Sequence, residues 1–146
     1  MKMRKLILAS IILVLLDQAT KYLMHGREYF SGFVSLRSTI NYGAAFSMLQ
    51  GWNWLFISIS VIVIFGISYY HKRFKNKLGI MLLLAGTAGN LIDRLLFGYV
   101  RDFISVRHFA TFNLADSFNV IGAALIIYFS YMEERAQKAL NTQKHK

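Results

Sequence analysis

Four long apolar stretches alternate with polar segments along this chain. They cover approximately residues 6–24, 52–70, 78–96 and 113–132. Each stretch approaches the roughly 20 helical residues that cross a hydrocarbon core of about 30 Å. The second stretch, WNWLFISISVIVIFGISYY, has no charged residue, whereas the other three reach spanning length only by including carboxylates. The pattern predicts an all-α membrane protein with four transmembrane helices, folded as a single domain over residues 1–146.

Two segments connect these stretches on one side, approximately 25–51 and 97–112. The first contains EYFSGFVSLRSTINYGAAF, in which β-branched and aromatic residues are interrupted by Gly32 and Gly43. Such a composition favours short strands separated by turns. We therefore expect a small β-containing cradle on the outer membrane surface.

The distribution of positive charge assigns an orientation to the spans. The formal net charge is +10, and the basic residues gather before the first stretch, between the second and third, and after the fourth: Lys2, Arg4, Lys5; Lys72, Arg73, Lys75, Lys77; Arg135, Lys138, Lys144, Lys146. Clusters at alternate junctions follow the positive-inside rule, which predicts cytoplasmic N- and C-termini. A nucleic-acid surface would gather its charge on one face, so we expect no nucleic-acid partner.

The first stretch is expected to remain as a transmembrane span. It has a basic start and an apolar body, as a secretory signal peptide does, but DQATK is a poor match to a small-residue cleavage site. Three further spans follow it, which also favours its retention.

The aspartates gather at the outer side of the predicted membrane domain. Helical rise places Asp93 about 24 Å from Lys77, and Asp116 about 26 Å from Glu133 in the antiparallel span. The cytoplasmic segments contain no aspartate, and the four in the chain are Asp17, Asp93, Asp102 and Asp116. A carboxylate within a span costs at least about 2.5–3.5 kcal/mol, so clustered carboxylates there are usually paired and functional.

Polar partners for these carboxylates lie at helical spacing. The pairs that would share one helix face or one helix start are Asp17 with Lys21, Asn90 with Arg94, and Asn113 with Asp116. The run LAGTAGN also places Ala85 and Gly89 at a small-xxx-small spacing, which lets a neighbouring span approach closely. We expect packing to be the main role of that run.

The available chemistry points to carboxylates. The chain lacks GxSxG and HExxH motifs, contains no cysteine, and has scattered histidines without ligand spacing. No metal or cofactor is implied. Two aspartates within hydrogen-bonding distance share one proton, so that one activates water while the other polarises a carbonyl. Spacing alone leaves all four aspartates as candidates for such a pair.

Two other functions compete with this interpretation. A small proton or ion transporter would use intramembrane carboxylates as a relay, and would distribute polar groups through the depth of the membrane. A non-catalytic assembly subunit would use the aspartates only as ion-pair partners of Lys21 and Arg94. The uncharged second stretch argues against a relay, whereas sequence patterns alone leave the assembly subunit open.

Five short motifs together resemble those of the bacterial lipoprotein signal peptidase family, signal peptidase II. They occur in that family's order within a four-span chain of its size: DQATK (17–21), NYGAAF (41–46), GNLIDR (89–94), VRDFI (100–104) and FNLADS (112–117). The resemblance implies an aspartic endopeptidase of the bacterial inner membrane, with its active site at the periplasmic side. It would remove signal peptides from prolipoproteins by cutting before a cysteine that carries a diacylglyceryl group.

The resemblance also assigns roles to individual residues. Asp102 and Asp116 match the catalytic aspartates, and Asp93 is expected to hold the end of the third span. The residues matching positions that shape or support the site are Asp17, Lys21, Asn41, Gly43, Asn90, Arg94 and Asn113. The expected partners are lipid-modified prolipoproteins and membrane lipids, and the expected state is a monomer. One departure is that Thr111 and Phe112 stand where the family often has a proline.

Overall fold

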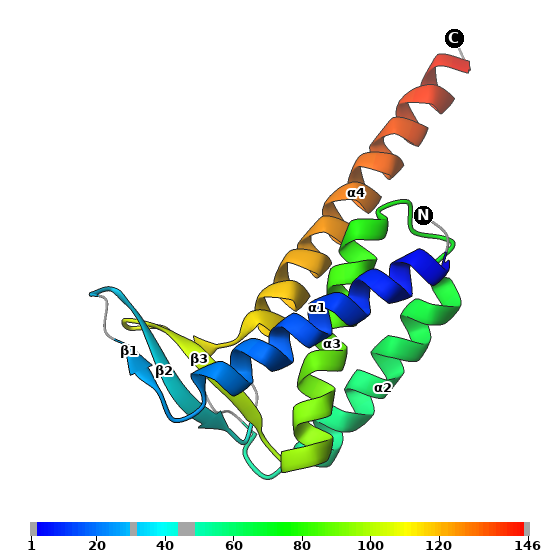
Figure 1. The fold of residues 1–146 in the computed structure, drawn as a ribbon. Helices are drawn as coiled ribbons and strands as arrows, with labels where there is room; N and C mark the ends of the chain where they lie inside the picture. The colour runs from blue at the N-terminus through cyan, green and yellow to red at the C-terminus, as the bar shows by residue number, and fades with distance from the viewer. Residues whose placement is uncertain (1–2, 30–31, 44–48, 145–146) are drawn as a thin grey trace.

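The computed structural model describes residues 3–29, 32–43 and 49–144. The remaining positions include part of the NYGAAF motif, at 44–46, and two of the basic residues, Lys2 and Lys146, so these parts of the predictions lie outside the described residues. In the described part, four helices and a four-stranded sheet follow the order α1, β1, β2, α2, α3, β3, β4, α4 (Figure 1). The predicted fold class is confirmed.

The four helices are long and apolar enough to cross a membrane. Their bounds are α1 Met3–Met24, α2 Asn53–Tyr70, α3 Lys77–Phe97 and α4 Leu114–Lys144. The apolar pattern predicted an end near residue 132 for the last helix, but α4 has 31 residues, about 46 Å of helix. Its additional turns carry the solvated charges of the C-terminal segment, and α4 projects beyond the other helices (Figure 1).

The helices bury polar residues and expose apolar ones, as expected in a lipid environment. Ile62 and Phe65 on α2 and Ile127 on α4 are each about 70% exposed, whereas Asp17 and Lys21 on α1 are almost completely buried. A lipid-facing helix gains nothing by hiding apolar side chains, but it must shield charge from hydrocarbon. Within the described helices, the buried charged residues are therefore Asp17, Lys21 and Asp93.

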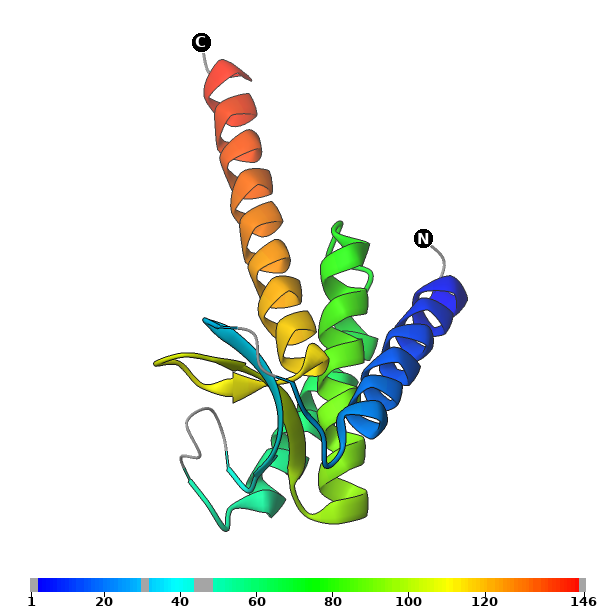
Figure 2. The same ribbon diagram turned by 60° about the vertical axis from the view of Figure 1, so that its left-hand side comes forward.

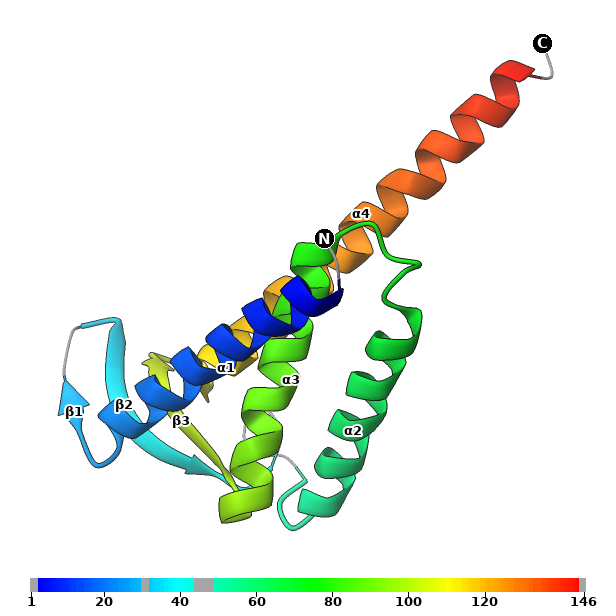
Figure 3. The same cartoon turned by 45° about the vertical axis from the view of Figure 1, so that its right-hand side comes forward.

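Helix α3 occupies the centre of the bundle and contacts each of the other three helices. Glycines allow α4 to approach it closely. A Cβ atom on Gly79 would lie 2.9 Å from the carbonyl oxygen of Gly122, and one on Gly122 would lie 2.7 Å from the amide nitrogen of Leu83. Gly86 likewise faces the backbone of Ala115. Small residues at helix interfaces permit this backbone-to-backbone packing in membranes. In Figure 3, α2 lies along another side of α3 and joins it through residues 71–76 at the end away from the sheet.

The sheet lies at the opposite end of the bundle from both termini (Figures 1 and 2). Its strands are β1 Glu28–Tyr29, β2 Val34–Asn41, β3 Val100–Val106 and β4 Thr111–Phe112, all antiparallel and in this spatial order. The sequence pattern predicted strands in the first outer segment, and the sheet draws on the second segment as well. β4 forms at Thr111 and Phe112. The β2–β3 register pairs Asn41 with Val100 and Thr39 with Asp102.

Candidate active site

The start of α4 is held by a reciprocal pair of hydrogen bonds between Asn113 and Asp116. The Asn113 Oδ1 atom accepts from the Asp116 backbone N–H at 2.9 Å, and Asp116 Oδ2 accepts from the Asn113 N–H at 3.2 Å. This is a capping-box geometry, which satisfies two backbone donors that the first turn of a helix leaves unpaired. The spacing of three that the sequence showed therefore fixes the Asp116 carboxylate at the helix start.

Asp102 lies beside Asp116, and Asn113 contacts both carboxylates. Asn113 Nδ2 donates to Asp102 Oδ1 at 2.7 Å, while Asn41 Nδ2 donates to Asp102 Oδ2 at 3.0 Å. The other oxygen of Asp116 accepts from Asn90 Nδ2 at 2.7 Å. Each oxygen of the two carboxylates therefore has a neutral amide or backbone donor.

Asp102 is 2% exposed, and this burial changes its acidity. Burial, followed by the nearby negative charge of Asp116, raises the pKa of the Asp102 carboxyl from 3.8 to about 7. Hydrogen bonds from Asn41 and Asn113 act in the opposite direction but do not cancel the increase. A carboxyl group with this pKa exchanges its proton near neutral pH, as acid–base catalysis requires.

A second group of charged residues contacts Asn90 and Ala115, next to the aspartate pair. This charge cluster consists of Asp17, Lys21, Asp93 and Arg101. Lys21 Nζ lies 2.8 Å from Asp17 and 3.4 Å from Asp93, and it donates to Asn90 Oδ1 at 2.9 Å. The Arg101 guanidinium binds Asp93 at 2.7 Å. Two positive and two negative charges balance, so the cluster buries no net charge.

The charge cluster connects α1, α3 and β3 to the start of α4. Asp17 Oδ1 accepts from the backbone N–H of Ala115 at 2.9 Å, which adds a capping bond from α1 to α4. The carboxylate can approach because α3 has Gly89 there, where a Cβ atom would lie 2.7 Å from Asp17 Oδ2. Gln18 joins Asp93 and Arg101 by hydrogen bonds of 3.1 and 2.7 Å. The LAGTAGN run thus provides close packing at Gly86 and at Gly89, the second of which belongs to the predicted Ala85/Gly89 spacing.

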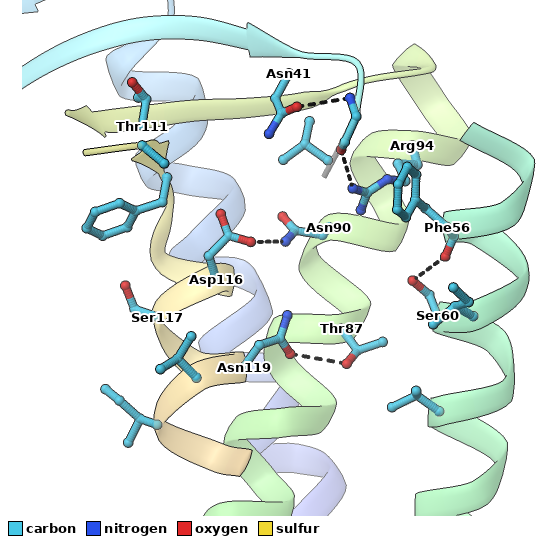
Figure 4. A pocket seen from close by; sticks show the side chains of 18 of the residues that line it. Asn41, Phe56, Ser60, Thr87, Asn90, Arg94, Thr111, Asp116, Ser117 and Asn119 are labelled. Atoms are coloured by element: carbon cyan, nitrogen blue, oxygen red, sulfur yellow. Dashed lines mark hydrogen bonds between the residues drawn. The ribbon is translucent and has the colours of Figure 1, made fainter. Parts of the chain in front are cut away.

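Arg94 and Gly43 form a separate link between the cradle and the helices. Arg94 Nη2 donates to the Gly43 carbonyl oxygen at 3.2 Å, and its guanidinium lies 4.9 Å from the ring centre of Phe56 on α2. The Gly43 N–H donates in turn to Asn41 Oδ1 at 2.9 Å, which orients the Asn41 amide toward Asp102. Figure 4 shows this connection above the cavity.

A cavity of about 730 Å³ opens beside Asp116 between α2, α3 and α4. Its walls are largely apolar, with Ile59 and Val63 on α2 and Val120 and Ile121 on α4. Its lining also includes Asn41, Asn90, Arg94 and residues 109–112 of the second outer segment, and Asn41, Arg94 and Thr111 lie on its side toward the sheet (Figure 4). The site therefore combines a largely apolar cavity with the Asp116 carboxylate in its lining.

The structure brings together all of the residues that the motifs singled out, including the supporting set. Sequence reasoning missed Arg101, whose position next to Asp102 suggested only an outer loop. It also missed the cavity wall, including Ser60, Thr87 and Asn119. Asn119 could have been predicted, because residues three apart on a helix share a face and Asn119 follows Asp116 by three.

Comparison with known proteins identifies the family of this chain. The profile of the family described as Signal peptidase (SPase) II matches residues 9–132. The chain belongs to the signal peptidase II family. A lipoprotein signal peptidase of Streptococcus pyogenes serotype M6 is 38% identical over 148 aligned residues, covering 92% of this chain and 97% of that protein. A second one, from serotype M2, matches at the same identity and coverage.

Solved structures share the fold of this signal peptidase II family member. A bacterial membrane enzyme determined by the in meso method at 2.3 Å resolution superposes with a TM-score of 0.81 at 31% identity, covering 93% of this chain and 92% of that one. Another, at 1.9 Å resolution, gives a TM-score of 0.75 at 34% identity, covering 86% and 92%. The predicted family is confirmed, and the chain is a multi-pass bacterial membrane protein.

Proposed function

We propose that this protein removes signal peptides from diacylglyceryl-modified prolipoproteins, cutting before the lipid-bearing cysteine with Asp102 and Asp116 as the catalytic pair. The observation that carries the proposal is that Asn113 binds both the Asp102 and the Asp116 carboxylates, and that Asp116 lines a largely apolar cavity. Family membership supports peptidase activity.

The pair would activate water with a single shared proton. An ionised carboxylate takes a proton from water as the water oxygen attacks the scissile carbonyl carbon, while the protonated partner donates its proton to the carbonyl oxygen. The tetrahedral intermediate then collapses, the C–N bond breaks, and a proton passes to the leaving amine. The raised pKa of Asp102 supports one protonated carboxyl group near neutral pH. We treat the two groups as one titrating unit.

The cavity would receive the substrate from within the membrane. A signal helix and two acyl chains stay in the bilayer, so entry between the spans, past α2 and α4, avoids extracting them into water. The sheet and the second outer segment would cover the reaction from bulk solvent at the periplasmic end. Holding both partners in the bilayer restricts their orientation, which contributes much of the entropic advantage of catalysis.

The geometry favours this function over the two alternatives. A relay across the membrane would need unpaired carboxylates at several depths, but the carboxylates within α1 and α3, Asp17 and Asp93, are both paired with Lys21. An assembly subunit would pair its aspartates with cations. In the described part of the chain, Asp102 and Asp116 have amide partners and no salt bridge.

The test is cleavage of a purified lipid-modified prolipoprotein by the detergent-solubilised protein. We expect the wild type to release the signal peptide, and Asp102→Asn and Asp116→Asn to release none. Glu134→Gln is a matched control, because it makes the same chemical change at an exposed position near the distal end of α4 and should leave the rate unchanged. Cleavage by both aspartate variants at the wild-type rate would refute the assignment of the pair, and an inactive wild type would refute the function.

A further inference from the structure

A second hydrogen bond joins α3 to α4 one helical turn below the contact between Asn90 and Asp116. Thr87 Oγ1 donates to Asn119 Oδ1 at 3.2 Å. Thr87 precedes Asn90 by three residues, and Asn119 follows Asp116 by three, so the two contacts are stacked about 4.5 Å apart along the helices. Figure 4 shows them on the same wall of the cavity.

The Asn119 side chain occupies a space that α3 provides for it. A Cβ atom on Gly86 would lie 2.5 Å from Asn119 Oδ1, so the amide could not occupy this position if residue 86 had a side chain. The hydroxyl of Thr87, a residue that is 8% exposed, donates to the same oxygen. Because its oxygen is held against α3, the amide of Asn119 presents its Nδ2 group to the cavity.

The Nδ2 group of Asn119 is an unused donor at this depth. It makes no hydrogen bond with any residue in the described ranges. The nearby cavity-lining hydroxyls are engaged within their own chain segments, since Ser60 donates to Phe56 O at 2.8 Å and Ser117 donates to Asn113 O at 3.2 Å. The surrounding wall is largely apolar. An amide donor in such surroundings is favourable only when an acceptor satisfies it.

A peptide undergoing cleavage supplies such an acceptor. The scissile segment must leave its helical conformation, which releases backbone carbonyl groups from their internal hydrogen bonds. The hydrocarbon region offers no water to replace those bonds, so a carbonyl group without a donor is unfavourable there. A donor on the cavity wall close to the catalytic pair would remove this cost.

We propose that Asn119 Nδ2 donates to a substrate backbone carbonyl one or two residues to the N-terminal side of the scissile bond. This inference rests on the proposed function. A signal peptide continues from its cut site toward the cytoplasm, so the residues before the cut lie on the deeper side of Asp116, where Asn119 lies. Asn119 lies about 4.5 Å deeper than Asp116 along the helix. An extended chain advances about 3.3 Å per residue, so this offset corresponds to one or two substrate residues.

Steady-state kinetics on a lipid-modified peptide substrate test this role. We expect Asn119→Leu, which has a similar size but no donor, to raise KM about tenfold, the effect of one lost hydrogen bond. The value of kcat should stay within twofold, because the bond forms in the bound substrate and persists in the transition state. Thr87→Val, which releases the amide, should raise KM by a smaller factor.

A change in the substrate identifies the contact. Replacing the peptide bond that contains this carbonyl by an ester weakens the acceptor, so KM should rise for the wild type and should not rise further for Asn119→Leu. Asn119→Ala, which introduces no added bulk against Gly86, should behave like the leucine variant. An unchanged KM in both Asn119 variants, or a joint fall of kcat and melting temperature, would overturn the inference while leaving the proposed function intact. An inactive wild type would instead overturn the function.

Discussion

Removing the Asp17 carboxylate should destabilise the fold because it breaks two kinds of interaction. Asp17 is fully buried, pairs with Lys21 at 2.8 Å and caps Ala115 on α4 at 2.9 Å. Removing one partner of a buried ion pair costs about 3–5 kcal/mol, and loss of a helix cap costs about 1 kcal/mol. Lys21 keeps acceptors on Asn90 and Asp93, which favours the lower end of the range. We therefore expect Asp17→Ala to cost about 4 kcal/mol.

Thermal unfolding in detergent, followed by the fluorescence of Trp52 and Trp54, measures this loss. At about 2–4 °C per kcal/mol for a chain of this size, Asp17→Ala should lower the melting temperature by roughly 10 °C. Asp17→Asn is the matched comparison, because its Oδ1 atom can still accept from Ala115 while the charge is lost. It should therefore retain about 1 kcal/mol more stability than the alanine variant.

A double-mutant cycle with Lys21→Met isolates the ion pair. The double variant removes one positive and one negative charge, leaving Asp93 paired with Arg101 and the charge cluster neutral. We expect its cost to be smaller than the sum of the two single costs by about 1–3 kcal/mol. Strictly additive effects, or a melting temperature of Asp17→Ala equal to that of the wild type, would refute the view that charge balance stabilises this cluster.

Three other changes test the packing and the acidity of the site. Gly86→Ala should lower stability by about 1–3 kcal/mol, since its Cβ would overlap Ala115 and Asn119, whereas Gly66→Ala on α2 meets open space and should be neutral or slightly stabilising in the same melting assay. Because the pKa of Asp102 is raised from 3.8 to about 7, the folded state holds a proton that the unfolded state releases. Stability should therefore fall as pH rises from about 4 to 7, by up to about 1.4 kcal/mol per pH unit, and denaturation of Asp102→Asn should lack this slope. The same pKa predicts that the cleavage rate falls above about pH 7, with an acid limb when both carboxyls are protonated; a profile that is flat from pH 4 to 9 would contradict the shared proton.

The sequence specified the helices more completely than the site. Span length and charge asymmetry predicted α1 to α4, because crossing a bilayer imposes a strong constraint on composition. Asp102 and Asp116 lie on either side of a loop, so no helical period could bring them together. Their proximity depends on the β2–β3 register, which places Asn41 near Asp102, and on the Asn113 cap.

Strand alternation explains why Arg101 was missed. Adjacent residues in a strand face opposite sides, so Arg101 contacts Asp93 and Gln18 while Asp102 contacts Asn41 and Asn113. The sequence pattern identifies residues 97–112 only as a connection between spans, which gives no indication of this alternation. Recognising VRDFISV as a strand would have predicted that the two charges of this motif serve different groups.

Because the cations pair with Asp17 and Asp93 and not with Asp102, the proposed aspartate pair can keep a proton. A cation beside Asp102 would favour its ionised form, and the proton needed on the pair would be lost near neutral pH. The buried cations Lys21 and Arg101 instead neutralise Asp17 and Asp93. Neutral amides orient the oxygens of the proposed pair without supplying a full charge, and Asn90 connects the pair to the charge cluster by accepting from Lys21 and donating to Asp116. The charge cluster thus holds the geometry of the site, while burial and the charge of Asp116 raise the pKa of Asp102 more than the amide hydrogen bonds and the charge of Lys21 lower it.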